Sequence, residues 1–269
     1  VAAIISTFPS FAPWKMHMIF AVIALLTYGN LRGVKEAGKV FALPTYFFVT
    51  CMLVVFGMGL YRLANGTLPM MDTDLPGAVE VGEAQGLLTF AAVFILLRAF
   101  ANGGSSLTGL EAISDGVGLF KAPEHVNAKR TLVVMSTLLG TLVLGVSFFA
   151  HKIHAMPYES GVPTVISQIA KVAVGTGTFG SVMFILVQLA TMLILFAGAN
   201  TTYSAFPLLV NFVATDGYLP RQLTKRGHRL AFSNGILLLS GGGILLVVIT
   251  AGSVEHLVAF YALGVFTGF

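Results

Sequence analysis

Apolar runs of about twenty residues recur along this chain from one end to the other. A helix needs about 20 apolar residues to cross the hydrocarbon core of a bilayer, because it rises about 1.5 Å per residue. Only 10% of the 269 residues are charged and 56% are hydrophobic, whereas an ordinary soluble domain has roughly 25% charged residues. The pattern predicts an all-α membrane protein that is embedded in the bilayer over nearly its whole length.

Polar residues, glycines and prolines divide the apolar runs into seven predicted spans. The segment 163–174 is too short and too polar to cross, so we expect it to form a helix on the outer surface. The chain begins at Val1 and ends inside an apolar run, and we interpret 1–269 as a single transmembrane domain that is incomplete at both ends. The predicted spans are 16–30, 40–63, 87–116, 131–149, 179–210, 233–251 and 255–269.

Basic residues alternate in number between the two sides of this predicted bundle. Cytoplasmic loops carry the excess of Lys and Arg, so the richer side predicts that loops 31–39, 117–130 and 216–232 are cytoplasmic in a multi-pass protein of the cell membrane. The formal net charge is +4, but these residues lie in short loops and not along one helix face, so no nucleic-acid partner is expected. The richer side has Arg32, Lys35, Lys39, Lys121, Lys129, Arg130, Arg221, Lys225, Arg226 and Arg229, and the other has Lys15, Arg62, Lys152 and Lys171.

The third span is interrupted by the sequence NGGSSLTG. In this stretch Leu107 is the one good helix former. Unwound backbone at membrane depth is tolerated only where protein surrounds it or where it lines a wet cavity, and transporters use such discontinuous helices to bind substrates and ions. The interruption therefore predicts that Ser105, Ser106, Thr108 and Gly109 line a substrate path. The alternative is that these small residues only permit close packing of helices.

Glu111 follows the interruption directly. An ionisable group near the bilayer centre costs at least about 2.5 kcal/mol and is a functional candidate by default. The positive end of a helix beginning near Leu110 would favour its charged form, and burial would favour its protonated form. Glu111 is therefore our candidate for proton exchange. The alternative is a structural pair with a serine or with Arg98.

Weaker candidates are Tyr203 and Ser204 in the fifth predicted span, which could face a pathway, although hydrogen bonding between helices explains most such residues. His151 and His154 have i, i+3 spacing, which is weak evidence for a metal. We predict no metal site and no cofactor. The chain has no hydrolase, phosphate-binding or zinc-protease motif, so we do not expect an enzyme.

Two longer segments resemble the amino acid-polyamine-organocation (APC) superfamily. They are SSLTGLEAISDGV with the following FKAPEHVNAKRT, and SAFPLLVNFVATDGYLPRQLTKRGHRLAFSNG. The resemblance implies the LeuT-like core of five-plus-five inverted repeats, in which the seven spans would be helices 4–10, the interrupted span would be the discontinuous helix 6, and helices 1–3 would be absent.

Within that superfamily, LTGLEAIS and FYALGVFTGF are most similar to the KimA-like branch, which is related to the KUP potassium importers. This resemblance implies that Thr108 and Glu111 belong to a cation site and that Tyr261 is its aromatic partner. Amino acid permeases share the tripeptide Gly109, Leu110, Glu111, which therefore does not choose between branches. The polar run before it favours a bare cation.

The sequence thus predicts a secondary active transporter with proton-coupled potassium uptake. The alternatives are a proton-coupled amino acid permease and a transport-dead membrane sensor on the same scaffold. The expected partners are the lipid bilayer and the transported small cation or amino acid with its coupling proton. A homodimer with a second copy of the chain is left open beside a monomer.

Overall fold

The computed structural model describes residues 1–32, 38–71, 89–104, 117–158, 160–225 and 232–268, and in these ranges the chain forms helices and no strand. The all-α prediction is confirmed for this part of the chain. The α-helices are α1 (Ala2–Thr7), α2 (Lys15–Leu31), α3 (Gly38–Ala64), α4 (Phe90–Gly104), α6 (Glu124–Lys152), α7 (Val165–Val174), α8 (Thr178–Thr215), α9 (Ser233–Ile249) and α10 (Val254–Gly268). The 3₁₀ helices are η1 (Pro9–Trp14), η3 (Val117–Leu119) and η4 (Arg221–Thr224).

Four helical stretches in the described ranges are long and apolar enough to cross a membrane: Pro9–Leu31, Ala42–Ala64, Glu124–Lys152 and Thr178–Thr215. They coincide with the first, second, fourth and fifth predicted spans. The helices α4, α9 and α10 are also apolar but have 15, 17 and 15 residues, which is less than the usual length of a span. The number of spans and the inverted repeat stay predictions, and residues 105–116 of the interrupted span lie outside the described ranges.

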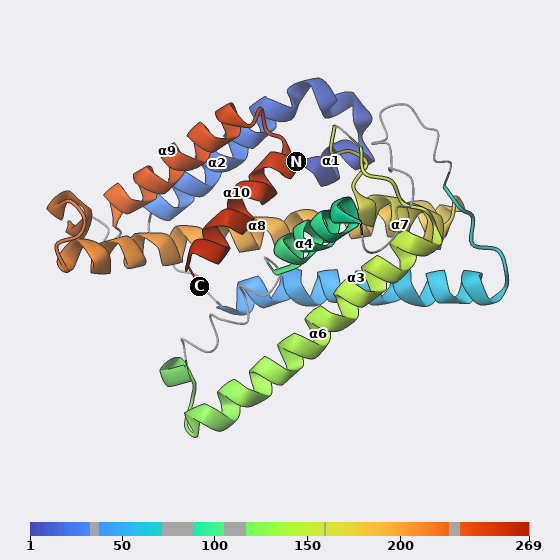
Figure 1. Cartoon of the computed structure of the whole chain (residues 1–269), viewed down its shortest axis with the longest axis horizontal. Coiled ribbons are helices and arrows are strands. Elements are labelled where there is room, and N and C mark those ends of the chain that lie inside the picture. The colour runs from blue at the N-terminus through green and yellow to red at the C-terminus, as the bar shows by residue number, and fades with distance from the viewer. Residues whose placement is uncertain (33–37, 72–88, 105–116, 159, 226–231, 269) are drawn as a thin grey trace.

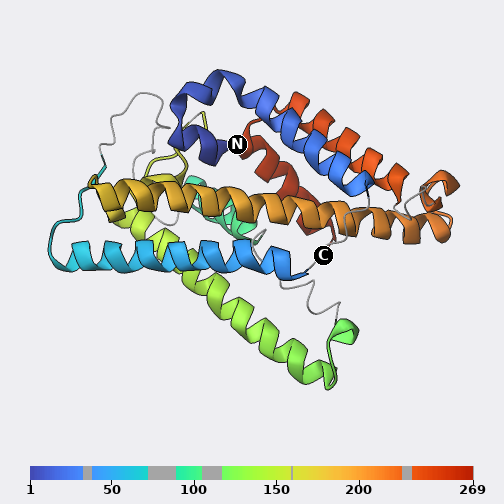
Figure 2. The same ribbon diagram turned by 180° about the vertical axis from the view of Figure 1, so that it is seen from behind.

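The long helices alternate in direction. In Figure 1, α2 and α8 run toward the left edge, and α3 and α6 run toward the right edge; Figure 2 shows the same alternation from behind. The end of α2, the start of α6 and η4 therefore lie on one side. Basic residues lie at these places: Arg32 directly follows α2, Lys129 lies in the second turn of α6, and Arg221 begins η4. The loops that the charge count groups together thus lie on one side of the molecule, as far as they are described.

The 38-residue α8 joins two packed regions. Its first half lies in a hydrophobic cluster with α3, α6 and α7, in which Val55, Ile169 and Val187 have no more than 1% of their surface exposed. Its second half packs with α2 and α9 in a smaller cluster formed by Leu26, Tyr203 and Ile236. Because one helix takes part in both regions, its position fixes each region relative to the other.

The short helix α7 is held at both of its ends. At its start, the side chain of Thr164 accepts a hydrogen bond from the backbone N–H of Ser167, as an N-cap does. At its end, the Arg62 guanidinium on α3 donates to the carbonyl oxygen of Val172 at 2.6 Å. That carbonyl is one of the four that a helix leaves without an internal partner. Gly175 follows with φ of +79° and lies beside the same guanidinium, so Arg62 holds the end of α7 against α3.

Helices α3 and α6 approach closely because a phenylalanine of each helix packs against a glycine of the other. A Cβ atom at Gly59 would collide with the ring of Phe149, and one at Gly145 would collide with the ring of Phe56. The two rings stack with centroids 5.6 Å apart and planes inclined by 14°. Neither ring can move without losing the other as a neighbour, so the contact requires glycine at both positions.

We expect Gly145→Ala to lower the thermal stability of the full-length protein. Alanine is the better helix former by about 1 kcal/mol, but overpacking at a fixed contact costs about 1–3 kcal/mol, and the second effect should dominate. The control is Gly140→Ala on the same helix, where an added Cβ meets no atom within 4 Å. The unfolding temperature in detergent should fall for Gly145→Ala and stay level or rise for Gly140→Ala. A rise in both variants would contradict the packing argument.

Candidate functional site

The interrupted helix that carries most of the predicted site is described only up to Gly104, where α4 ends. Ser105, Ser106, Thr108, Gly109 and Glu111 lie outside the described residues. Their roles stay predictions from the sequence.

Tyr261 lies on α10, and α10 contacts α4. The exposed fraction of the Tyr261 side chain is 49%. The structure therefore brings the helix of Tyr261 against the helix that leads into the interruption, and the role of Tyr261 as an aromatic partner stays a prediction. Figure 1 shows these two helices beside each other, in red and dark green.

Tyr203 lies where α2, α8 and α9 meet, and it is buried. Its hydroxyl oxygen is 3.3 Å from the hydroxyls of both Thr27 on α2 and Ser240 on α9, and those two hydroxyls are 2.7 Å apart. Ser240 also lies 2.8 Å from the carbonyl oxygen of Ile236. A hydroxyl donates one proton and accepts two hydrogen bonds. Thr27 likewise lies 2.7 Å from the carbonyl oxygen of Ile23, so its single proton goes either to Ile23 on its own helix or to Ser240 on α9. The three hydroxyls lie within hydrogen-bond distance of one another, and they join α2, α8 and α9.

A second polar contact between α2 and α8 lies one helical turn away. The side-chain amide of Asn30 on α2 donates to Asn200 Oδ1 on α8 at 2.8 Å and to the carbonyl of Leu26 at 2.9 Å. Thr27 with Asn30, and Asn200 with Tyr203, each have i, i+3 spacing and therefore share one helix face. The result is a polar seam, formed by Thr27, Asn30, Asn200, Tyr203 and Ser240, within an otherwise apolar interface.

The backbone beside this seam is also unusual. Pro207 lies inside α8, and because proline has no N–H, the carbonyl of Tyr203 cannot receive its ordinary helical hydrogen bond. A Cβ at Gly235 on α9 would lie 2.9 Å from Pro207 Cα, so α9 begins in close contact with α8 here. Ser204 is exposed on another face of α8. Tyr203 thus takes part in interhelical hydrogen bonding, and a pathway role for Tyr203 and Ser204 stays a prediction.

Sequence reasoning selected Tyr203 but not its partners. Thr27 and Asn30 belong to the first predicted span and Ser240 to the sixth, and only the tertiary structure shows that they meet Tyr203 or Asn200 of the fifth. The i, i+3 spacing of Thr27 and Asn30 in an apolar run was the available signal. In the ranges that the structure describes, no three His, Cys, Asp or Glu side chains are grouped closely enough to hold a metal ion.

We expect Tyr203→Phe to lower stability slightly and leave transport intact. Hydrogen bonds between membrane helices contribute about 0.6 kcal/mol on average, and the variant removes only the hydroxyl. Tyr218→Phe is the matched control, since the Tyr218 side chain is 84% exposed. The measurements are the unfolding temperature and the uptake rate of the full-length protein. Uptake that collapses while the fold remains stable would place Tyr203 on the pathway instead.

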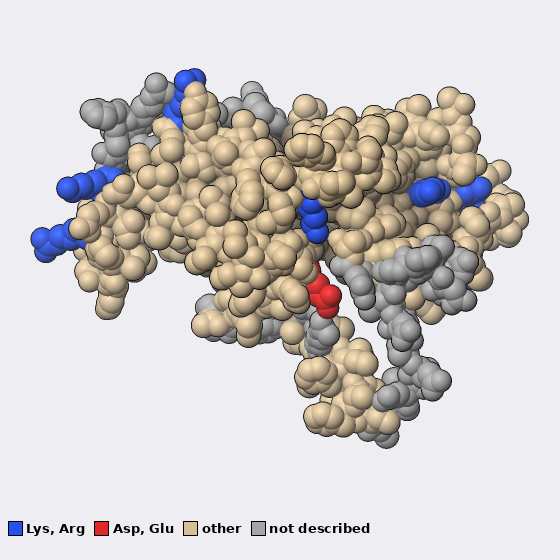
Figure 3. Space-filling view, turned by 90° about the horizontal axis from the view of Figure 1, so that it is seen from above, with Lys and Arg blue, Asp and Glu red and all other residues tan. Residues whose placement is uncertain are grey.

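The charge distribution agrees with a molecule that lies in a bilayer. Figure 3 shows few Lys, Arg, Asp or Glu side chains on the face it presents, and a broad surface without them. Large apolar side chains such as Phe94, Leu144 and Leu195 are more than half exposed. With four apolar helices of membrane length, these features define a multi-pass membrane protein.

The sequence model of the family described as amino acid permease matches residues 1–268, and the chain belongs to this family. The APC resemblance seen in the sequence is thereby confirmed. The chain is also 39% identical over 270 residues to the protein "Potassium transporter KimA" of Bacillus subtilis (strain 168). This alignment covers 99% of the chain and 42% of that protein, so the chain spans less than half the length of this relative.

Proposed function

We propose that this chain is part of the core of a secondary active transporter that takes up potassium together with protons. The observation that carries the proposal is the 39% identity to a potassium transporter along 99% of the chain. An alignment of this extent covers the interruption with Thr108 and Glu111 and the helix of Tyr261. In this proposal, oxygen ligands near the interruption bind the cation, and Glu111 exchanges the coupling proton.

The described helices also supply the rigid part that such a transporter needs. The polar seam between α2, α8 and α9 holds three helices in a fixed arrangement, since its hydroxyls and amides bond to one another and to backbone carbonyls. A transporter that works by alternating access needs one rigid group of helices against which another can move. We assign α2, α8 and α9 to the rigid group, with loops 31–39, 117–130 and 216–232 on the cytoplasmic side.

The second candidate is a proton-coupled amino acid permease, and the family description favours it. The two proposals differ in what the protein carries. The test compares uptake of rubidium, as a tracer for potassium, with uptake of a panel of amino acids by the full-length protein in proteoliposomes. Rubidium uptake that increases when the outside is made more acidic supports the first proposal. Amino acid uptake without rubidium uptake overturns it and supports the second, and uptake of neither overturns both and leaves the sensor.

A further inference from the structure

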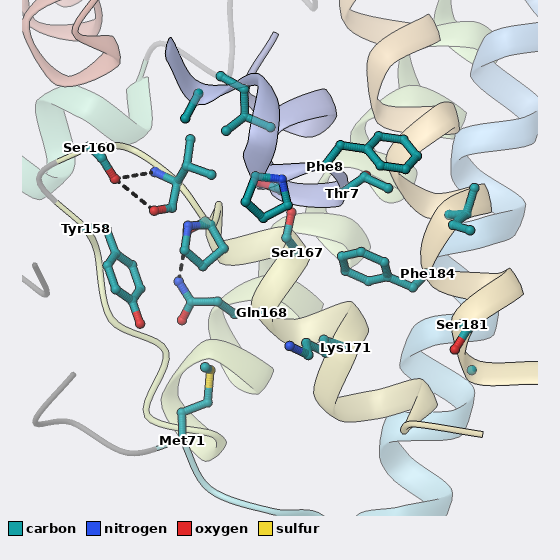
Figure 4. A pocket seen from close by; sticks show the side chains of 18 of the residues that line it. Thr7, Phe8, Met71, Tyr158, Ser160, Ser167, Gln168, Lys171, Ser181 and Phe184 are labelled. Atoms are coloured by element: carbon teal, nitrogen blue, oxygen red, sulfur yellow. Dashed lines mark hydrogen bonds between the residues drawn. The ribbon is translucent and has the colours of Figure 1, made fainter. Parts of the chain in front are cut away.

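A cavity of about 950 Å³ lies at the end of the molecule opposite η4. Its walls come from α1 and η1, from α7 with the loop before it, and from the first turns of α8. Figure 4 shows how Phe8, Ser167 and Phe184 from these three parts of the chain surround it. Pockets that hold small molecules have volumes of about 300–1,000 Å³, so this cavity is large enough for an organic ligand.

The polar groups in the wall of the cavity already make hydrogen bonds to other groups of the protein. Gln168 is buried, and its side-chain amide donates to the carbonyls of Met156 and Pro163 while its oxygen accepts from the Met156 N–H. The hydroxyl of Ser167 accepts a hydrogen bond from Gln188 and is bonded to Thr164. These residues shape the cavity but have little capacity left for a ligand.

Lys15 and Lys171 are the charged side chains among the described residues that line the cavity. Lys171 lies on α7 and is exposed, and no hydrogen bond or ion pair holds its ammonium group in the described part of the chain. Lys15 makes a single contact of 3.4 Å with the carbonyl of Ser160, which is long for a hydrogen bond. Two ammonium groups at one cavity favour an anion and disfavour a metal cation.

The rest of the lining and its surroundings are apolar. Ile5, Phe184 and Ile185 line the cavity. Beside it on η1, Phe11 and Trp14 are about half exposed. Exposed tryptophan and long lysine side chains are typical of the boundary between the hydrocarbon core and the headgroups. A wholly soluble anion would have no use for this apolar wall, whereas a lipid would use both parts of the cavity.

We propose that this cavity binds the anionic headgroup of a membrane phospholipid, with Lys15 and Lys171 contacting the phosphate and with apolar side chains such as Phe184 contacting the start of an acyl chain. The proposal does not depend on which substrate the protein carries. Bound lipid would connect α2, α7 and α8 at this end, where the lysines otherwise have few partners.

The test is a titration of the purified full-length protein in detergent with phosphatidylglycerol and, separately, with phosphatidylcholine of the same acyl chains. The unfolding temperature measures binding. We expect phosphatidylglycerol to raise it and phosphatidylcholine to raise it much less. A basic residue near anionic lipid contributes about 1 kcal/mol, so Lys15→Gln with Lys171→Gln should weaken the apparent affinity about thirtyfold.

The control variant is Lys152→Gln. Lys152 is exposed at the end of α6, lies 5.9 Å from the ring centroid of Phe148, and does not line the cavity. The Lys152→Gln variant should bind phosphatidylglycerol as the unchanged protein does. The double variant Lys15→Arg with Lys171→Arg, which keeps both charges, should also retain binding, and it shows whether the glutamine variant loses affinity or only stability.

Equal affinity of the glutamine variant and the unchanged protein would overturn the proposal. So would equal stabilisation by the two lipids, or stabilisation by inorganic phosphate alone to the same degree, which would identify a site for a soluble anion. No stabilisation by either lipid would also overturn it.

Discussion

Changing Glu111 to Gln in the full-length protein should abolish the response of uptake to the pH outside. Glutamine has nearly the shape of glutamate but cannot exchange a proton at neutral pH. If one proton enters with each substrate, a difference of one pH unit across the membrane supplies about 1.4 kcal/mol, which corresponds to about tenfold accumulation. We therefore expect proteoliposomes with the unchanged protein to accumulate about tenfold more rubidium per unit of outside acidification, and the variant to show a flat profile.

Glu124→Gln is the matched control for this experiment, because Glu124 is an exposed carboxylate in the first turn of α6. It should leave the pH profile unchanged. The amount of protein in the vesicles and its unfolding temperature show whether Glu111→Gln still folds. A folded Glu111→Gln variant that keeps the tenfold response would remove Glu111 from proton coupling and restrict it to a structural pair.

The helices are the part of this fold that follows most directly from sequence. Apolar runs of membrane length have few alternatives to a helix, because the backbone must satisfy its hydrogen bonds without water. The predicted span 131–149 lies inside the helix Glu124–Lys152, which extends further at both ends. The polar residues added there, such as His125 and Lys152, can remain helical outside the hydrocarbon core, where an apolar pattern gives no information about helix ends.

The segment 163–174 shows what a polarity argument misses. The polarity of this segment predicts a helix on the outer surface, and a short helix is present at Val165–Val174. Yet Gln168 and Ser167 are each only 2% exposed, because their polar groups bond to the neighbouring loop and to α8. A buried glutamine and an exposed one look the same in a sequence, since the difference lies in partners that are distant in the chain.

Some features of the candidate site can be recognised in the sequence, and others appear only in the folded chain. The interruption and its carboxylate are local features, and they can be recognised in one short stretch of sequence. The polar seam and the lysine-lined cavity combine residues from segments more than a hundred positions apart, such as Thr27 with Tyr203 and Lys15 with Lys171. No periodicity within a single helix specifies such a meeting, so these features become visible only in the folded chain.

Gln168→Leu should destabilise the full-length protein by about 2–4 kcal/mol, because it removes three hydrogen bonds at once. The side-chain oxygen of Gln168 accepts a hydrogen bond from the N–H of Met156 at 3.1 Å. Its NH₂ group donates to the carbonyl of Met156 at 2.7 Å and to the carbonyl of Pro163 at 3.1 Å. Leucine has a similar volume but no polar atom, so these backbone groups would lose their partner beside a buried side chain. The loop 153–163 would then be less firmly attached to α7, and the wall of the cavity would loosen.

The matched control is Gln222→Leu, because Gln222 is exposed on η4 and the same chemical change there removes no buried hydrogen bond. Denaturation of both variants in detergent, without added anionic lipid, gives the two free-energy changes. We expect a lower unfolding temperature for Gln168→Leu only, together with faster proteolysis in the loop 153–163. If both variants unfold like the unchanged protein, then Gln168 does not hold this loop, and the cavity that depends on it needs another explanation for its shape.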